Sequence, residues 1–151
     1  MKKTVLIIFA SFIISNCSST KNIRNSSFSK EESQLVLSAN SLVPMRVFKI
    51  TNKKDSLVLR TKSSYVKANP NDVVLQQFVK RLYATVRDSM SLGVGIAAPQ
   101  VGVLKNIIWV QRFDKENVPF EVYLNPKIVK YSKEKQTVKE GCLSIPNRSD
   151  T

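Results

Sequence analysis

Two short segments carry the residue types that could do chemistry in this chain. They are residues 93–100, with the sequence GVGIAAPQ, and residues 140–144, with the sequence EGCLS. The thiol of Cys142 could serve as a nucleophile or a metal ligand, or could be a buried and inert side chain. The amide of Gln100 could donate a hydrogen bond to a developing negative charge, or stabilise a turn. The sequence contains no histidine, which excludes a Ser-His-Asp triad, a Cys-His pair and any histidine-rich metal site within these residues.

The glycines of residues 93–100 also fit the G-x-G-x-x-A form of a dinucleotide-binding fingerprint. That fingerprint requires a strand before it and a helix after it. Here a helix is predicted before it, and Pro99 and Gly102 follow. We therefore exclude a nucleotide site, which leaves a tight glycine turn as the simple alternative.

The element that must position the first segment is a helix predicted over residues 72–92. Apolar residues recur there every three or four positions, Asn71 or Asp72 can cap its start, and Gly93 suits a left-handed end. The recurring residues are Leu75, Val79, Leu82, Val86 and Met90.

Short strands are predicted around the second segment. Residues 107–110 and 118–124 favour strands, and the polar residues 114–117 between them favour a hairpin loop. Weaker strand candidates are 45–50, which could instead be simply extended, 56–59, 128–129 and 137–138. One long helix beside short, mostly antiparallel strands defines an α+β fold.

The first 42 residues are interpreted as a targeting signal followed by a flexible tether. A basic start and an apolar run at residues 5–14 are typical of a secretory signal, and the run is too short for a comfortable membrane span. The run ends near Cys17, which resembles a bacterial lipoprotein signal. We expect a signal peptide at 1–16, lipidation of Cys17, a flexible Ser- and Asn-rich tether at 17–42 and a membrane-anchored place in the cell envelope. An ordinary signal peptide, an uncleaved anchor or a cytoplasmic location are the alternatives.

The net charge of +13 raises the question of a nucleic-acid partner. The lysines are scattered, and no aromatic side chains interleave with the densest runs as a base-stacking platform requires. We therefore expect plain solvated basic faces, with a weak attraction for anionic surfaces as the alternative, and no nucleic acid. Two cysteines are too few for a disulfide framework.

Taken together, the two segments resemble the first two signature motifs of the peptide deformylases. Residues 58–60 (VLR), the long helix and residues 124–128 (LNPKI) also resemble that family. The resemblance covers residues 43–151 and implies the peptide-deformylase-like fold. It also implies an activity, the metal-dependent hydrolysis of the formyl group from N-formylmethionyl peptides.

The resemblance also implies roles for particular residues. Cys142 would be one ligand of a divalent metal, usually iron(II) and sometimes zinc or nickel. The Gln100 amide and the Leu143 N–H would stabilise the oxyanion. Val94, Gly95 and Ile96 would form a backbone edge beside the N-formylated peptide, where a glycine lets the ligand approach closely.

The chain departs from the family pattern after the second motif. The family takes its other two metal ligands from the histidines of a later H-E-x-x-H helix, and the 151 residues contain neither that motif nor any histidine. One cysteine cannot make a mononuclear site. We therefore expect an incomplete domain at 43–151 without the C-terminal helix, catalytically inactive and poorly folded alone. The alternative is a noncatalytic envelope lipoprotein that retains a remnant of the fold.

Overall fold

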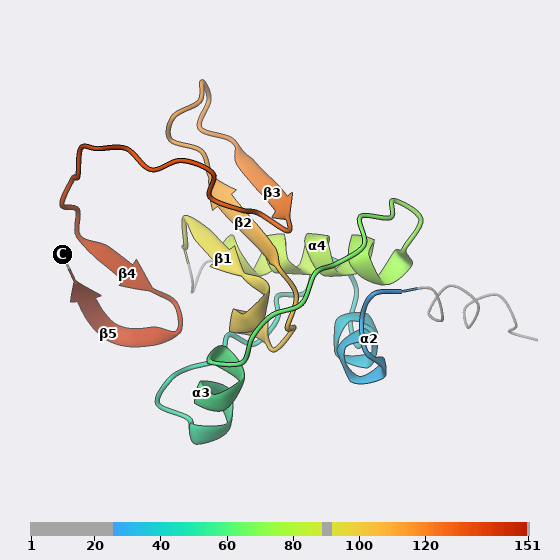
Figure 1. Ribbon diagram of the computed structural model, residues 1–151. Coiled ribbons are helices and arrows are strands. Elements are labelled where there is room, and N and C mark those ends of the chain that lie inside the picture. Colours follow the sequence, from blue (N-terminus) through green and yellow to red (C-terminus); the bar gives the residue numbers. More distant parts are fainter. Residues whose placement is uncertain (1–25, 89–91, 151) are drawn as a thin grey trace, which may run out of the picture.

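The computed structural model describes residues 26–88 and 92–150 of the chain (Figure 1). A three-stranded sheet has the order β1-β2-β3, and a separate two-stranded sheet pairs β4 with β5; all pairs are antiparallel. This is the α+β fold with short antiparallel strands that the sequence predicts. The elements are α2 (Lys30–Leu37), α3 (Lys53–Leu59), α4 (Val73–Val86), β1 (Gly95–Ala97), the 3-10 helix Ala98–Val101, β2 (Ile107–Gln111), β3 (Phe120–Leu124), β4 (Glu140–Cys142) and β5 (Ile145–Asp150).

The long helix α4 begins where the sequence predicts and ends earlier. The Asp72 side chain caps its first turn by accepting hydrogen bonds from two backbone N–H groups. The helix stops at Val86, because the Gly93 N–H donates to the Val86 carbonyl at 3.1 Å and draws the chain back. The predicted left-handed cap at Gly93 is wrong: Leu92, with φ of 42°, takes the left-handed conformation. Residues 89–91 lie outside the described residues.

Helix α4 packs across the three-stranded sheet and forms the core with it. Trp109 of β2 donates its indole N–H to the Val79 carbonyl at 2.9 Å, and its ring lies 4.9 Å from that of Tyr83. The β2–β3 hairpin around residues 114–117 is confirmed, with Trp109 paired to Val122. Among the described residues, the buried apolar core consists of Phe28, Val36, Met45, Val66, Val74, Leu75, Phe78, Leu82, Val86, Ile96, Ala98, Val101, Val103 and Ile107.

Three of the weaker strand predictions are wrong. Residues 56–59 belong to α3, because the Asn52 side chain caps a helix there by accepting from Lys54 and Asp55 N–H groups. Residues 128–129 and 137–138 lie in an exposed connection between β3 and β4, where the described residues offer no strand to pair with them. Residues 45–49 have no regular secondary structure and a turn begins at Ile50, so no strand forms at 45–50.

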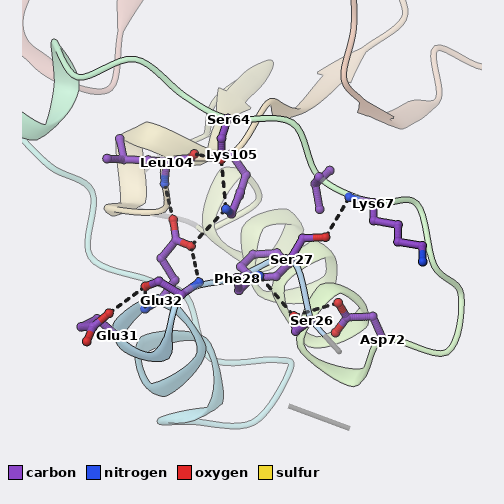
Figure 2. A network of polar contacts seen from close by, with 12 residues as sticks. Ser26, Ser27, Phe28, Glu31, Glu32, Ser64, Lys67, Asp72, Leu104 and Lys105 are labelled. Atoms are coloured by element: carbon purple, nitrogen blue, oxygen red, sulfur yellow. Dashed lines mark hydrogen bonds and ion pairs between the residues drawn. The ribbon is translucent and has the colours of Figure 1, made fainter. Parts of the chain in front are cut away.

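The described part of the expected tether is folded onto the domain, which corrects the interpretation of residues 26–42. Ser29 and Glu32 form a reciprocal capping box that starts α2, and Val36 is fully buried. Figure 2 shows Glu32 also accepting from the Leu104 N–H at 2.9 Å and pairing with Lys105 at 3.5 Å. Because both partners come from a loop far along the chain, the sequence pattern of this polar segment gave no sign of its packing.

A buried arginine joins this N-terminal segment to α4. Arg81 is 4% exposed and donates to the carbonyls of Leu35, Val36 and Val43. A polar side chain thus satisfies the carbonyls at the end of α2, which an isolated helix would leave unpaired. The predicted signal peptide and Cys17 lie outside the described residues. Among the residues that the structure describes, no helix is long and apolar enough to cross a membrane.

Candidate functional site

The two chemistry-bearing segments line one open cleft of about 920 Å³. One wall comes from the turn into β1 and from Gln100, and the other comes from the β4–β5 hairpin. In Figure 1 this hairpin lies on the side of the molecule away from α2. The tertiary structure therefore brings together residues that are far apart in the sequence. The lining residues are Lys49, Leu92, Gly93, Val94, Gly95, Gln100, Phe113, Lys139, Glu140, Gly141, Cys142, Leu143, Ile145, Pro146, Asn147, Arg148 and Ser149.

The Gln100 side chain is oriented by contacts at both ends of its amide. Its Oε1 accepts from the Ala97 N–H at 2.9 Å, so the amide nitrogen faces the hairpin. That nitrogen donates to Ser144 Oγ at 3.2 Å and lies 4.0 Å from Cys142 Sγ. The short 3-10 helix Ala98–Val101 makes this possible, because Pro99 starts a turn that carries Gln100 back over β1. Gln100 thus presents a fixed N–H donor beside the cysteine.

The second segment forms the tip of the β4–β5 hairpin. Cys142 is an exposed free thiol at the end of β4. Leu143 packs its side chain against the core, and Ser144 is 4% exposed beneath it. Gly93 fits closely against this tip, because a Cβ there would lie 3.1 Å from Leu143 Cδ1 and 3.1 Å from Val86 Cγ2. The glycine of the first segment therefore allows the second segment to dock.

The three predicted substrate-edge residues have different surroundings. Val94 is 53% exposed at the mouth of the cleft, whereas the Ile96 side chain is buried in the core. Only the backbone of Ile96 is therefore a candidate for ligand contact. A Cβ on Gly95 would lie 3.3 Å from the Trp109 carbonyl oxygen, so close packing on β2 also explains this glycine. β1 pairs with β2 on one side and is an edge strand of the described sheet.

Two residues of the site carried no recognisable signal in the sequence. Lys49 lines the cleft and donates from Nζ to the Leu143 carbonyl. Asp55 of α3 accepts from the Lys49 N–H at 3.0 Å and from both guanidinium nitrogens of Arg46, at 2.7 and 2.9 Å. The bond from Arg46, followed by that from the Lys49 N–H, holds the pKa of the Asp55 carboxyl below its usual range. The contact between Lys49 and Leu143 joins segments from opposite ends of the domain, so spacing alone could not indicate it.

The donor set fits a metal only in part. Cys142 offers one thiol sulfur in an accessible position, as a metal ligand requires. Across residues 26–88 and 92–150, no group of three His, Cys, Asp or Glu side chains could hold an ion. The described residues therefore supply one ligand position and not a complete site.

Comparison with known proteins gives the family. The model of the family described as polypeptide deformylase matches residues 46–151, so this chain belongs to the polypeptide deformylases, which are metal-dependent hydrolases. A peptide deformylase of Desulforudis audaxviator is 42% identical over 105 residues, which cover 68% of this chain and 61% of that protein. The chain thus spans about three-fifths of the length of that relative.

Solved structures agree with the fold. A class I type b peptide deformylase of Acinetobacter baumannii bound to K1U is 33% identical, with a TM-score of 0.60. The match covers 72% of this chain and 68% of the other. A structure of the Acinetobacter baumannii enzyme bound to Met-Ala-Ser has a TM-score of 0.59 and 32% identity, and the match covers 72% of this chain and 69% of the other.

Proposed function

We propose that the cleft binds the formylated end of a peptide, as part of a site that removes the formyl group from N-formylmethionyl peptides. One observation carries the proposal: the Gln100 amide is held with its nitrogen toward Cys142 Sγ, 4.0 Å away. Metal-dependent amide hydrolysis needs a fixed hydrogen-bond donor, here the Gln100 N–H, beside a potential metal ligand, here the Cys142 sulfur. The donor is needed because negative charge develops on the carbonyl oxygen in the transition state. The similarity to an enzyme bound to Met-Ala-Ser supports a peptide as the ligand.

In such a site, different residues of the chain have different roles. Gln100 Nε2 and the Leu143 N–H stabilise the oxyanion that forms when the formyl carbon is attacked. The edge of β1 from Val94 to Ile96 binds the peptide backbone by strand addition. The docked tip of the hairpin holds Cys142 and Ser144 beside the Gln100 amide nitrogen.

Cys142 would hold one position on the metal, iron(II) or alternatively zinc or nickel. A bound divalent metal would supply hydroxide at neutral pH by lowering the pKa of its bound water to about 7. Because the 151 residues contain no histidine, they do not include the other two ligands that the family uses. We therefore propose that these 151 residues bind formylated peptides without turning them over.

The test uses formyl-Met-Ala-Ser and its unformylated counterpart with the 151-residue chain. We expect calorimetry to detect tighter binding of the formylated peptide, and we expect Gln100→Leu to abolish that preference. A release assay with added iron(II), nickel or zinc should show no formate above the buffer rate. Equal affinity for both peptides would contradict the assigned cleft, and robust turnover would contradict the proposed inactivity.

A noncatalytic envelope lipoprotein that retains a remnant of the fold is the second candidate, favoured by the apolar run that ends near Cys17. The discriminating observation is the gene beyond codon 151, where an H-E-x-x-H codon run supports the enzyme. We also propose lipidation of Cys17 and an envelope location for either candidate. Palmitate labelling that disappears in Cys17→Ala is expected, and purely cytosolic fractionation would refute the anchor.

A further inference from the structure

One short segment, residues 48–50, contacts both halves of the cleft. The Phe48 N–H donates to the Gln100 carbonyl at 2.7 Å, on the first half. The Ile50 N–H donates to the Ser144 carbonyl at 3.0 Å, on the second half. Between them, the Lys49 ammonium donates to the Leu143 carbonyl. This segment therefore sets the distance between the two halves.

These contacts reach the hairpin at its tip. β4 and β5 form a sheet of their own, and all three residues of β4 are exposed. Polar ties to the rest of the domain are present at residues 142–144 and come from Gln100 and from residues 49 and 50. These ties act directly on the tip that follows Cys142.

Lys49 is itself held in place from the other side. Its N–H donates to Asp55, a carboxylate that is 4% exposed and is paired with Arg46. Asp55 lies in the first turn of α3, whose start Asn52 caps. A chain of contacts therefore runs from α3 through Lys49 to the tip of the hairpin, and a charge-assisted bond from an ammonium group is its last link.

We propose that Lys49 is a positioning residue for the metal-ligand hairpin. Each peptide unit is planar, so a bond to the Leu143 carbonyl fixes the plane between residues 143 and 144. The bond from Ile50 fixes the next plane. Together they restrict the rotation of the tip, which keeps Cys142 Sγ and Ser144 Oγ beside the Gln100 amide nitrogen. The catalytic importance of this orientation rests on the proposed function. The contact between Lys49 and the Leu143 carbonyl is independent of that function.

The experiment measures amide hydrogen exchange, residue by residue, in the full 151-residue chain. The Ile50 N–H reports on the hairpin, and the Phe48 N–H, bonded to Gln100 on the sheet side, is its internal control. Lys49→Met should lower the protection factor of Ile50 about tenfold, as expected for losing a hydrogen bond to a charged group. The protection factor of Phe48 should change less than about twofold.

Matched variants distinguish a loss of hairpin positioning from the effect of removing a positive charge and from a general loss of stability. Lys53→Met removes the same charge from an exposed side chain of α3 and should leave Ile50 protected. Lys49→Arg restores a cationic donor and should recover most of the protection. Unchanged protection of Ile50 in Lys49→Met would overturn the proposal, as would equal losses at Phe48 and Ile50. Failure of the wild-type chain to bind formyl-Met-Ala-Ser would count against the proposed function and leave this reading intact.

Discussion

Replacing Gly102 with alanine should destabilise the domain through two separable effects. Gly102 has φ of 82°, and an added Cβ would lie 2.5 Å from Cζ of Phe48. A non-glycine residue in the left-handed region costs about 1–2 kcal/mol. Moving the ring out of the way adds about 1–3 kcal/mol. We expect Gly102→Ala to lower the free energy of unfolding by about 2–5 kcal/mol.

A double-mutant cycle tests this reasoning. In a Phe48→Ala background the overlap is gone, so Gly102→Ala should cost only about 1–2 kcal/mol. Gly141 is the matched control, because a Cβ there would meet nothing within 4 Å. Gly141→Ala should change the free energy by less than about 0.5 kcal/mol.

Urea unfolding followed by the fluorescence of Trp109 measures all four variants and the wild type. Since we expect limited stability of these residues on their own, trimethylamine N-oxide can lengthen the native baseline. Equal effects of Gly102→Ala in both backgrounds would refute the steric argument. An effect of Gly141→Ala as large as that of Gly102→Ala would refute the whole account of the two glycines.

Three further predictions follow from single contacts. Gln100→Leu should lower kcat/KM by about 10²–10³ in a metal-loaded protein that includes the family's histidines. Circular dichroism should show an unchanged fold. A kcat/KM within about threefold of the wild-type value would contradict a role of Gln100 in stabilising the oxyanion. Arg81→Met should leave buried carbonyls unpaired and lower the free energy of unfolding by about 2–4 kcal/mol. It should also expose residues 26–45 to limited proteolysis. Cleavage of the variant at the wild-type rate would contradict the packing of this segment. The contacts that lower the pKa of the Asp55 carboxyl stabilise the fold above the unfolded-state pKa of about 3.9, and this stabilisation is lost as pH falls through the folded-state pKa. Asp55→Asn should therefore make the urea midpoint depend less on pH between neutral and acidic conditions. The same pH dependence of the midpoint in the variant and the wild type would contradict this role.

Local patterns in the sequence determined the elements that form within short stretches. The Asp72 cap and the apolar period fixed the start and the buried face of α4, and the alternation around residues 114–117 fixed the β2–β3 hairpin. The residue types at 93–100 and 140–144 also identified the family, which the match over residues 46–151 confirms. These features depend on neighbours within a few positions, so a single sequence contains their cause.

The end of α4 and the packing of residues 26–42 were decided by tertiary contacts. The Val86 carbonyl bonds to Gly93 instead of to the next helical turn, and α2 is held by Arg81 from the opposite side of the core. Such competition between partners has no fixed spacing in the sequence.

The site divides in the same way. The sequence by itself determined which groups could do chemistry, because a thiol, an amide and close-packing glycines are properties of residue types. Only the tertiary structure decided their mutual orientation: Oε1 of Gln100 accepts from Ala97, and Lys49 holds the carbonyl of Leu143. The physical reason is that orientation depends on hydrogen bonds between segments far apart in the chain, whose meeting is set by the burial of the core and not by any local pattern.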